Sequence, residues 1–271
     1  MRTRHVFSIL LLITATAAFA APPEVMTIVQ QMKAAFEPAR PSTRKVEISV
    51  SGPNGEKVTW VAHQARAPIA GDKRTLLVIE EPEHSKGNAL LIWEREGQQP
   101  NTMWWYPPAL RRVRELLPVE GYQRFFDSDL TYADLGYVER QGTYRLLGEL
   151  EHGGKQTYEI EFVPDQKVFY SRIITWVTTD TMLPVQRNYY DVAGRLWKTM
   201  TFGRVKTIDD IPTPLHIRMR DVQQDTGTDV TFSEVRYDVD LPDTLFDPER
   251  LPQTVEARWW EPESNRIATG E

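Results

Sequence analysis

The stretch Met103–Arg114 reads MWWYPPALRRVR, and the interpretation of the chain begins there. Its first four side chains are large, as strands favour, and alternation puts Trp104 and Tyr106 on one face of a strand and Trp105 on the other. Two prolines then break the strand, and three arginines follow within four positions. Aromatic faces suit an apolar ligand, and guanidinium groups suit an anionic one. Because the stretch contains no obvious nucleophile or metal ligand, it favours binding over catalysis.

Alternating patterns predict that most of the chain is β-structure. Residues 46–50 and 58–62 alternate apolar and polar side chains on either side of a Gly-Pro-Asn-Gly turn, which is typical of a hairpin. Similar runs recur to residue 239, and we expect about 11 strands in an antiparallel barrel or sandwich. The exception is residues 24–37, where apolar side chains recur at the spacing of one helical face and a proline ends the run.

The first 20 residues have the pattern of a cleavable signal peptide. Arg2 and Arg4 precede a short apolar run, and Ala18-Phe19-Ala20 matches the small-residue cleavage motif. We therefore predict secretion to the periplasm. The chain contains no cysteine, so we expect no disulfide and no lipid anchor, and no later stretch is apolar enough to span a bilayer. We expect a soluble protein with one domain at 21–252 and a C-terminal tail at 253–271, where the pattern fades.

Charge and composition argue against several classes of function. The formal net charge of −6 disfavours nucleic-acid binding, which requires neutralisation of phosphates. The histidines lack metal-binding spacing and there is no glycine-rich phosphate loop, so we expect no metal and no cofactor. Ser128 has neither a nucleophile-elbow motif nor a nearby histidine, and Ser128 or Asp129 is interpreted as the cap of a short helix. We therefore predict that the protein is not an enzyme.

Two motifs resemble the LolA-like family of outer-membrane lipoprotein-sorting proteins. The first follows the pattern Met-Trp-x-Tyr-x-Pro-x-x-x-Arg-Val-Arg, and the second follows Ser-Asp-x-x-Tyr-x-Asp-Leu. The matching residues are Met103, Trp104, Tyr106, Pro108, Arg112, Val113, Arg114, Ser128, Asp129, Tyr132, Asp134 and Leu135. The resemblance covers the chain from the first helix to about residue 252 and includes Leu241-Pro242-Asp243 and Phe246. It departs at Asp127, where the family usually has glycine.

The resemblance implies a mainly β fold: a curved, incomplete antiparallel β-barrel of about 11 strands. In such a fold, the N-terminal amphipathic helix and short helices cover an apolar cavity that holds acyl chains. The implied function is that of a periplasmic carrier, which binds acyl chains of a lipid or lipoprotein in an envelope export or sorting pathway. The alternative is a binding module that carries no lipid and instead assists an RND-type transporter or senses envelope stress.

Eight residues are candidates for ligand binding: Trp60, Trp93, Trp104, Tyr106, Arg111, Arg112, Arg114 and Tyr132. We expect aromatic side chains to line the cavity and arginines to lie at its rim, with Trp104 and Tyr106 inside and Arg112 and Arg114 beside the mouth. The competing interpretations are ordinary sheet packing for the aromatic residues and a solvated loop for the arginines. The expected partners are a lipid or acylated lipoprotein and an RND-type inner-membrane transporter, but no nucleic acid.

Overall fold

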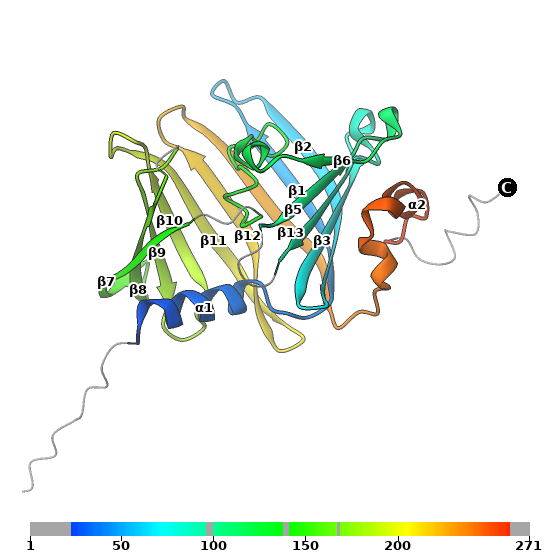
Figure 1. Cartoon of the computed structure of the whole chain (residues 1–271). Coiled ribbons are helices and arrows are strands. Elements are labelled where there is room, and N and C mark those ends of the chain that lie inside the picture. The colour runs from blue at the N-terminus through cyan, green and yellow to red at the C-terminus, as the bar shows by residue number, and fades with distance from the viewer. Residues whose placement is uncertain (1–22, 96–99, 138–140, 167–168, 261–271) are drawn as a thin grey trace, which may run out of the picture.

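In the part of the chain that the structure describes, thirteen strands form one continuous antiparallel sheet that curves into an open half-barrel (Figure 1). The computed structural model describes residues 23–95, 100–137, 141–166 and 169–260, so the predicted signal peptide lies outside the described residues. The predicted curved, incomplete antiparallel class is confirmed, but the predicted number of about 11 strands is wrong. One strand that the pattern did not reveal is β6, whose three residues are too few to show alternation.

The bounds of the strands are as follows. They are β1 (Ser42–Ser51), β2 (Lys57–Ile69), β3 (Asp72–Glu81), β4 (Ala89–Glu94), β5 (Thr102–Tyr106), β6 (Arg114–Leu116), β7 (Gly142–His152), β8 (Lys155–Pro164), β9 (Arg172–Thr178), β10 (Pro184–Tyr190), β11 (Leu196–Ile208), β12 (Ile211–Asp221) and β13 (Thr226–Tyr237). The short 3₁₀ helices η1 (Glu83–Ser85) and η2 (Pro108–Leu110) lie between strands of the first half.

The first and last strands pair with each other in the middle of the sheet. From the pair of β1 and β13, the sheet continues through β2 to β6 on one side and through β12 to β7 on the other. As a result, β6 and β7 are consecutive in the sequence but lie at opposite edges of the sheet. The connection between them must therefore cross the open side of the half-barrel.

Residues 117–137, here termed the covering segment, begin this crossing. The segment includes the 3₁₀ helix η3 (Pro118–Tyr122) and lies inside the curve of the sheet (Figure 1). Its Phe125 and Leu130 are buried in one apolar cluster with Val46 and Ile48 of β1. This interior cluster draws residues from strands on both sides of the central pair, so the covering segment packs against both halves of the sheet.

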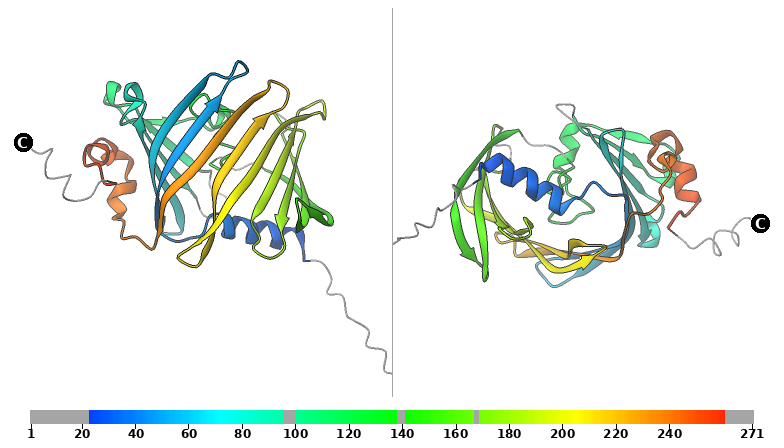
Figure 2. Two further views of the ribbon diagram at one scale, coloured as in Figure 1. Left: turned by 180° about the vertical axis from the view of Figure 1, so that it is seen from behind. Right: turned by 90° about the horizontal axis from the view of Figure 1, so that it is seen from below.

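Helix α1 (Val25–Phe36) lies across the open side near the β7 edge (Figure 2). The helix predicted over residues 24–37 is therefore confirmed. Ile28, Val29 and Met32 share one face of the helix and are buried against Ile160 of β8 and Val177 of β9. Within the described part of the chain, no helix has the length and apolar character that a membrane span requires.

The C-terminal segment covers part of the convex face. It contains η4 (Asp243–Phe246), η5 (Pro248–Arg250) and α2 (Leu251–Glu256), which lie outside the curve of the sheet (Figure 2). Phe246 is fully buried, and Trp93 of β4 donates a hydrogen bond from Nε1 to its carbonyl oxygen at 2.9 Å. Trp259 and Trp260 pack against the apolar cluster that contains Phe246 and Trp93, which is here termed the outer cluster. The domain boundaries at residues 21 and 252 stay predictions.

Candidate ligand-binding site

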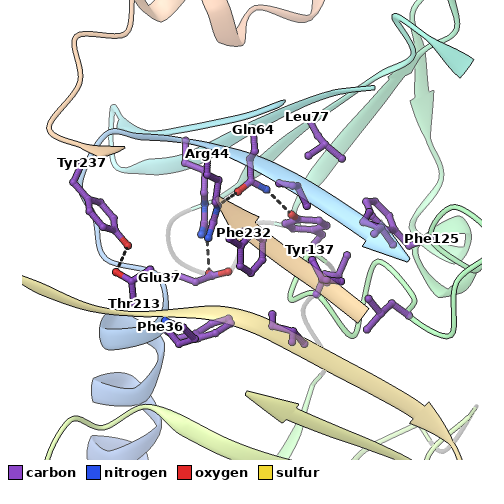
Figure 3. A pocket seen from close by; sticks show the side chains of 18 of the residues that line it. Phe36, Glu37, Arg44, Gln64, Leu77, Phe125, Tyr137, Thr213, Phe232 and Tyr237 are labelled. Carbon is purple, nitrogen blue, oxygen red and sulfur yellow. Dashed lines mark hydrogen bonds and ion pairs between the residues drawn. The ribbon is translucent and has the colours of Figure 1, made fainter. Parts of the chain in front are cut away.

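A cavity of about 60 Å³ lies inside the curved sheet, where β1 and β13 meet (Figure 3). Its apolar lining comes from the end of α1, the central strands and the covering segment, and includes Phe36, Ile48, Phe125, Leu130, Leu135, Ile217 and Val230. A cavity of this volume holds about two water molecules, because each occupies roughly 30 Å³ in the liquid. The closed arrangement therefore has no room for a long acyl chain.

One end of the cavity is polar. Arg44 of β1 lines it together with Gln64 and Arg66 of β2, and Tyr137 of the covering segment faces them (Figure 3). Arg44 donates a hydrogen bond from Nε to Oε1 of Gln64. The Nε2 group of Gln64 in turn donates to the Tyr137 hydroxyl at 3.3 Å. The Arg44 guanidinium also lies over the Phe232 ring, 4.5 Å from its centroid. Burial and the nearby Arg66 lower the pKa of Arg44 to about 10, and burial raises the pKa of Tyr137 to about 12.

Four charged side chains form an ion-pair cluster next to this polar end. Glu37, which follows α1, and Glu94 of β4 each pair with both Arg66 and Lys73 of β3. Burial would raise the pKa of Glu37, but the two cations outweigh burial and lower it to about 2. The pKa of Glu94 is raised, because burial and the charge of Glu37 outweigh the same cations. The cluster ties the end of α1 to the sheet.

Sequence reasoning missed these polar residues, although the strand pattern contained a signal. Arg44 has the same phase along β1 as the buried Val46 and Ile48. Gln64 and Arg66 likewise share the phase of Ala62 on β2. Because alternate residues of a strand face the same side, polar side chains in these positions face the interior.

Three of the predicted aromatic lining residues lie on the opposite side of the sheet. Trp93, Trp104 and Tyr106 belong to the outer cluster, whereas Trp105 packs against the interior cluster. The expected alternation is present, but the expectation that Trp104 and Tyr106 face the cavity is corrected. Both faces of the sheet are apolar here, because the C-terminal segment covers the convex one. The pattern alone therefore does not distinguish inside from outside.

Trp60 and Tyr132 lie on the interior side but do not line the cavity. Trp60 stacks on Phe126 with 5.0 Å between ring centroids, and Tyr132 meets Phe125 edge-on at 5.2 Å. Both therefore pack against the rings of the covering segment. Burial raises the pKa of Tyr132.

The three arginines that were expected at the rim lie away from the cavity lining. Arg111 and Arg112 are exposed, and Arg114 on β6 forms an ion pair with Glu120 at 2.9 Å. They therefore lie next to an edge of the sheet. A ligand-binding role for the eight residues chosen from the sequence stays a prediction.

The Ser128–Leu135 motif anchors the covering segment to the sheet. The Asp129 carboxylate accepts hydrogen bonds from the hydroxyls of Thr226 at 2.6 Å and Thr228 at 3.0 Å, both on β13. Lys198 of β11 donates from Nζ to the Asp129 carbonyl oxygen at 2.6 Å. Residues 128–135 form bends and turns in place of the expected capped helix. Asp129 therefore joins the covering segment to distant strands and does not cap a helix.

Comparisons with known proteins support this architecture. A family model described as "Uncharacterized protein" matches residues 71–253. The chain is similar to the structure of a DUF1329 family protein from Desulfovibrio piger, with 28% identity and a TM-score of 0.74 over 84% of this chain and 95% of that chain. No curated protein matches the sequence.

Two further solved structures share the fold. A domain from Vibrio parahaemolyticus, described as an outer membrane lipoprotein-sorting protein domain, gives 23% identity and a TM-score of 0.75 over 84% of this chain and 98% of that chain. A LolA superfamily protein from Nitrosomonas europaea gives 21% identity and a TM-score of 0.65 over 82% of this chain and 97% of that chain.

The anchoring role of Asp129 predicts a large effect of Asp129→Asn. The change turns one acceptor oxygen into a donor and removes a negative charge near the buried Lys198. We expect the free energy of unfolding, measured in urea, to fall by about 2–3 kcal/mol. The matched control is Asp127→Asn, the same change at an exposed position two residues away, which should stay within about 0.5 kcal/mol of the wild type. Equal losses in both variants would show that Asp129 is not an anchor.

The low pKa of Glu37 predicts a loss of stability in acid. Its ordinary value of 4.5 applies to the unfolded chain, and the folded value is about 2. The ionised carboxylate therefore stabilises the fold above about pH 4.5, and this contribution is lost as the pH falls toward 2. Glu37→Gln should make the free energy of unfolding less dependent on pH across this window, whereas Glu47→Gln at an exposed position should not. An unchanged dependence in Glu37→Gln would contradict the assignment.

Proposed function

The chain belongs to a LolA-like family, and from that premise we propose that it is a periplasmic carrier of acyl chains. The ligand would be a lipid or an acylated lipoprotein in an envelope export or sorting pathway. The observation that carries the proposal is the apolar cavity inside an open sheet, covered by α1 and the covering segment. Each buried methylene contributes about 0.8 kcal/mol, so such an interior can hold a chain without covalent chemistry.

The cavity must widen before a long chain can enter. The covering segment supplies Phe125, Leu130 and Leu135 to the lining, and these side chains occupy space on the open side of the sheet. Because β6 and β7 lie at opposite edges and do not pair with each other, the half-barrel can open without breaking any backbone ladder. Movement of the covering segment around its Asp129 anchor is the simplest route for entry.

Filling the cavity with protein atoms tests the carrier function. Leu135 lines the cavity and is only half-buried, so Leu135→Trp places an indole in the cavity at modest cost to folding. We expect acyl-chain affinity to fall about tenfold or more, equivalent to the loss of about two buried methylenes. Displacement of a fluorescent acyl probe would give the affinity, and native mass spectrometry would show which lipids stay bound after purification.

Leu147→Trp is the matched control, because Leu147 lies on β7 with 48% exposure and does not line the cavity. It should bind the probe as the wild type does. If wild-type protein binds no acyl probe, or if both variants bind it equally well, the cavity is not the site of acyl-chain binding.

A second candidate function is supported by the exposed apolar side chains of residues 110–119, here termed the patch. Leu110, Leu117 and Val119 are 74%, 63% and 70% exposed, and the exposed Arg111 and Arg112 lie in the same short stretch of chain. Several large apolar side chains left exposed in one short stretch of chain favour an interaction surface there. This patch suits the alternative in which the protein assists an RND-type transporter without carrying lipid.

A photo-crosslinking residue at position 119 tests this alternative in cells. Docking through the patch predicts an adduct with an RND-type transporter, and replacement of Leu117 and Leu110 by Ser should abolish it. The control position is Val192, which is 65% exposed and lies in the turn between β10 and β11. Adducts of equal yield from both positions would contradict specific docking at the patch.

A further inference from the structure

The charges at the polar end of the cavity do not balance. Arg44, Arg66 and Lys73 bring three positive charges, whereas Glu37 and Glu94 bring two negative charges. Both carboxylates are shared between Arg66 and Lys73. The polar end of the cavity therefore carries one surplus positive charge.

Arg44 carries this surplus. Its hydrogen bond goes to the neutral amide of Gln64, and its guanidinium lies over the Phe232 ring. Among the described residues, no carboxylate lies within ion-pair distance of it. Isolated charges are costly to bury, and they are tolerated where a counter-ion completes the pair. An anion from outside the chain would supply that counter-ion.

The position of Arg44 suits a headgroup. Arg44 and Arg66 line the main cavity and also a second, smaller cavity beside it, which is bordered by Pro38, Val235 and Tyr237. The main cavity continues from the guanidinium to the apolar side chains of Ile48, Leu77 and Leu130. The site thus joins a cationic end to an apolar interior, and these features match the two parts of an amphiphile.

We propose that the cavity binds a single-chain amphiphile with one anionic headgroup, a carboxylate or a phosphate, which pairs with Arg44. The guanidinium presents parallel N–H donors that fit either oxyanion. The chain of the amphiphile takes the space that the covering segment opens, so this proposal rests on the carrier function and names the class of its ligand. A single surplus charge and a narrow cavity favour one headgroup with one chain.

The test compares three ligands with the same chain: hexadecanoate, hexadecyl phosphate and the uncharged hexadecanol. Their dissociation constants are measured by displacement of a neutral fluorescent acyl probe. We expect the wild-type protein to bind at least one of the two anions about tenfold or more tightly than the alcohol, as a charge-assisted hydrogen bond provides. The tighter anion identifies the headgroup.

Variants then assign the preference to Arg44. In Arg44→Gln, the affinities for the anions and for the alcohol should differ by no more than about twofold. Arg44→Lys should retain part of the preference. The matched control is Arg172→Gln on β9, because Arg172 also lies over an aromatic ring, that of Tyr190 at 4.3 Å, but does not line the cavity.

The outcomes separate this proposal from the carrier function. If wild-type protein binds all three ligands equally, the headgroup site is wrong and the carrier function stands. If the preference for an anion survives in Arg44→Gln, Arg44 is not the headgroup site. If none of the three ligands binds, both the headgroup site and the carrier function are wrong. The comparison within the wild type requires no variant, so poor folding of Arg44→Gln would not prevent a decision.

Discussion

The pairing of β1 with β13 is the constraint on which the rest of the structure depends. This pairing places the first and last strands at the centre of the sheet and leaves β6 and β7 at opposite edges. The connection from β6 to β7 then has to cross the open side, which gives the interior its cover. A closed barrel would have paired β6 with β7 and needed no such crossing. The cavity and its covering segment thus follow from the order of the strands.

Two sets of polar contacts hold the covering segment and α1, together termed the cover, over the interior of the sheet. Asp129 joins the covering segment to β13 and β11 through short hydrogen bonds, and Glu37 joins the end of α1 to Arg66 and Lys73. Buried ion pairs add little net stability, because desolvation offsets their attraction, but losing one partner leaves the other buried and unpaired. Such contacts define one arrangement of the cover more sharply than apolar packing alone does.

The apolar patterns predicted most of the strands and helical spacing predicted α1, because each of these patterns arises within a single element. The pattern could not assign Trp104 and Trp105 to inside and outside, since that depends on the C-terminal segment, which reaches the convex face from 140 residues further along the chain. Arg44, Gln64 and Arg66 were recognisable as polar residues in an apolar phase. Their meeting with Glu37 and Tyr137 depends on packing between distant segments, and no local pattern encodes it.

The closed cavity also bears on how the proposed carrier would release its ligand. Phe125 and Leu130 are buried in the interior cluster and the half-buried Leu135 packs against it, so the covering segment covers apolar surface of the sheet. A chain that enters displaces these contacts, and its net affinity is smaller than the sum over its buried methylenes. The covering segment therefore competes with the ligand for the same apolar surface. In the proposed carrier, the Asp129 anchor would keep this competitor attached during exchange, so that the segment would return as the ligand leaves; this would favour transfer over permanent binding.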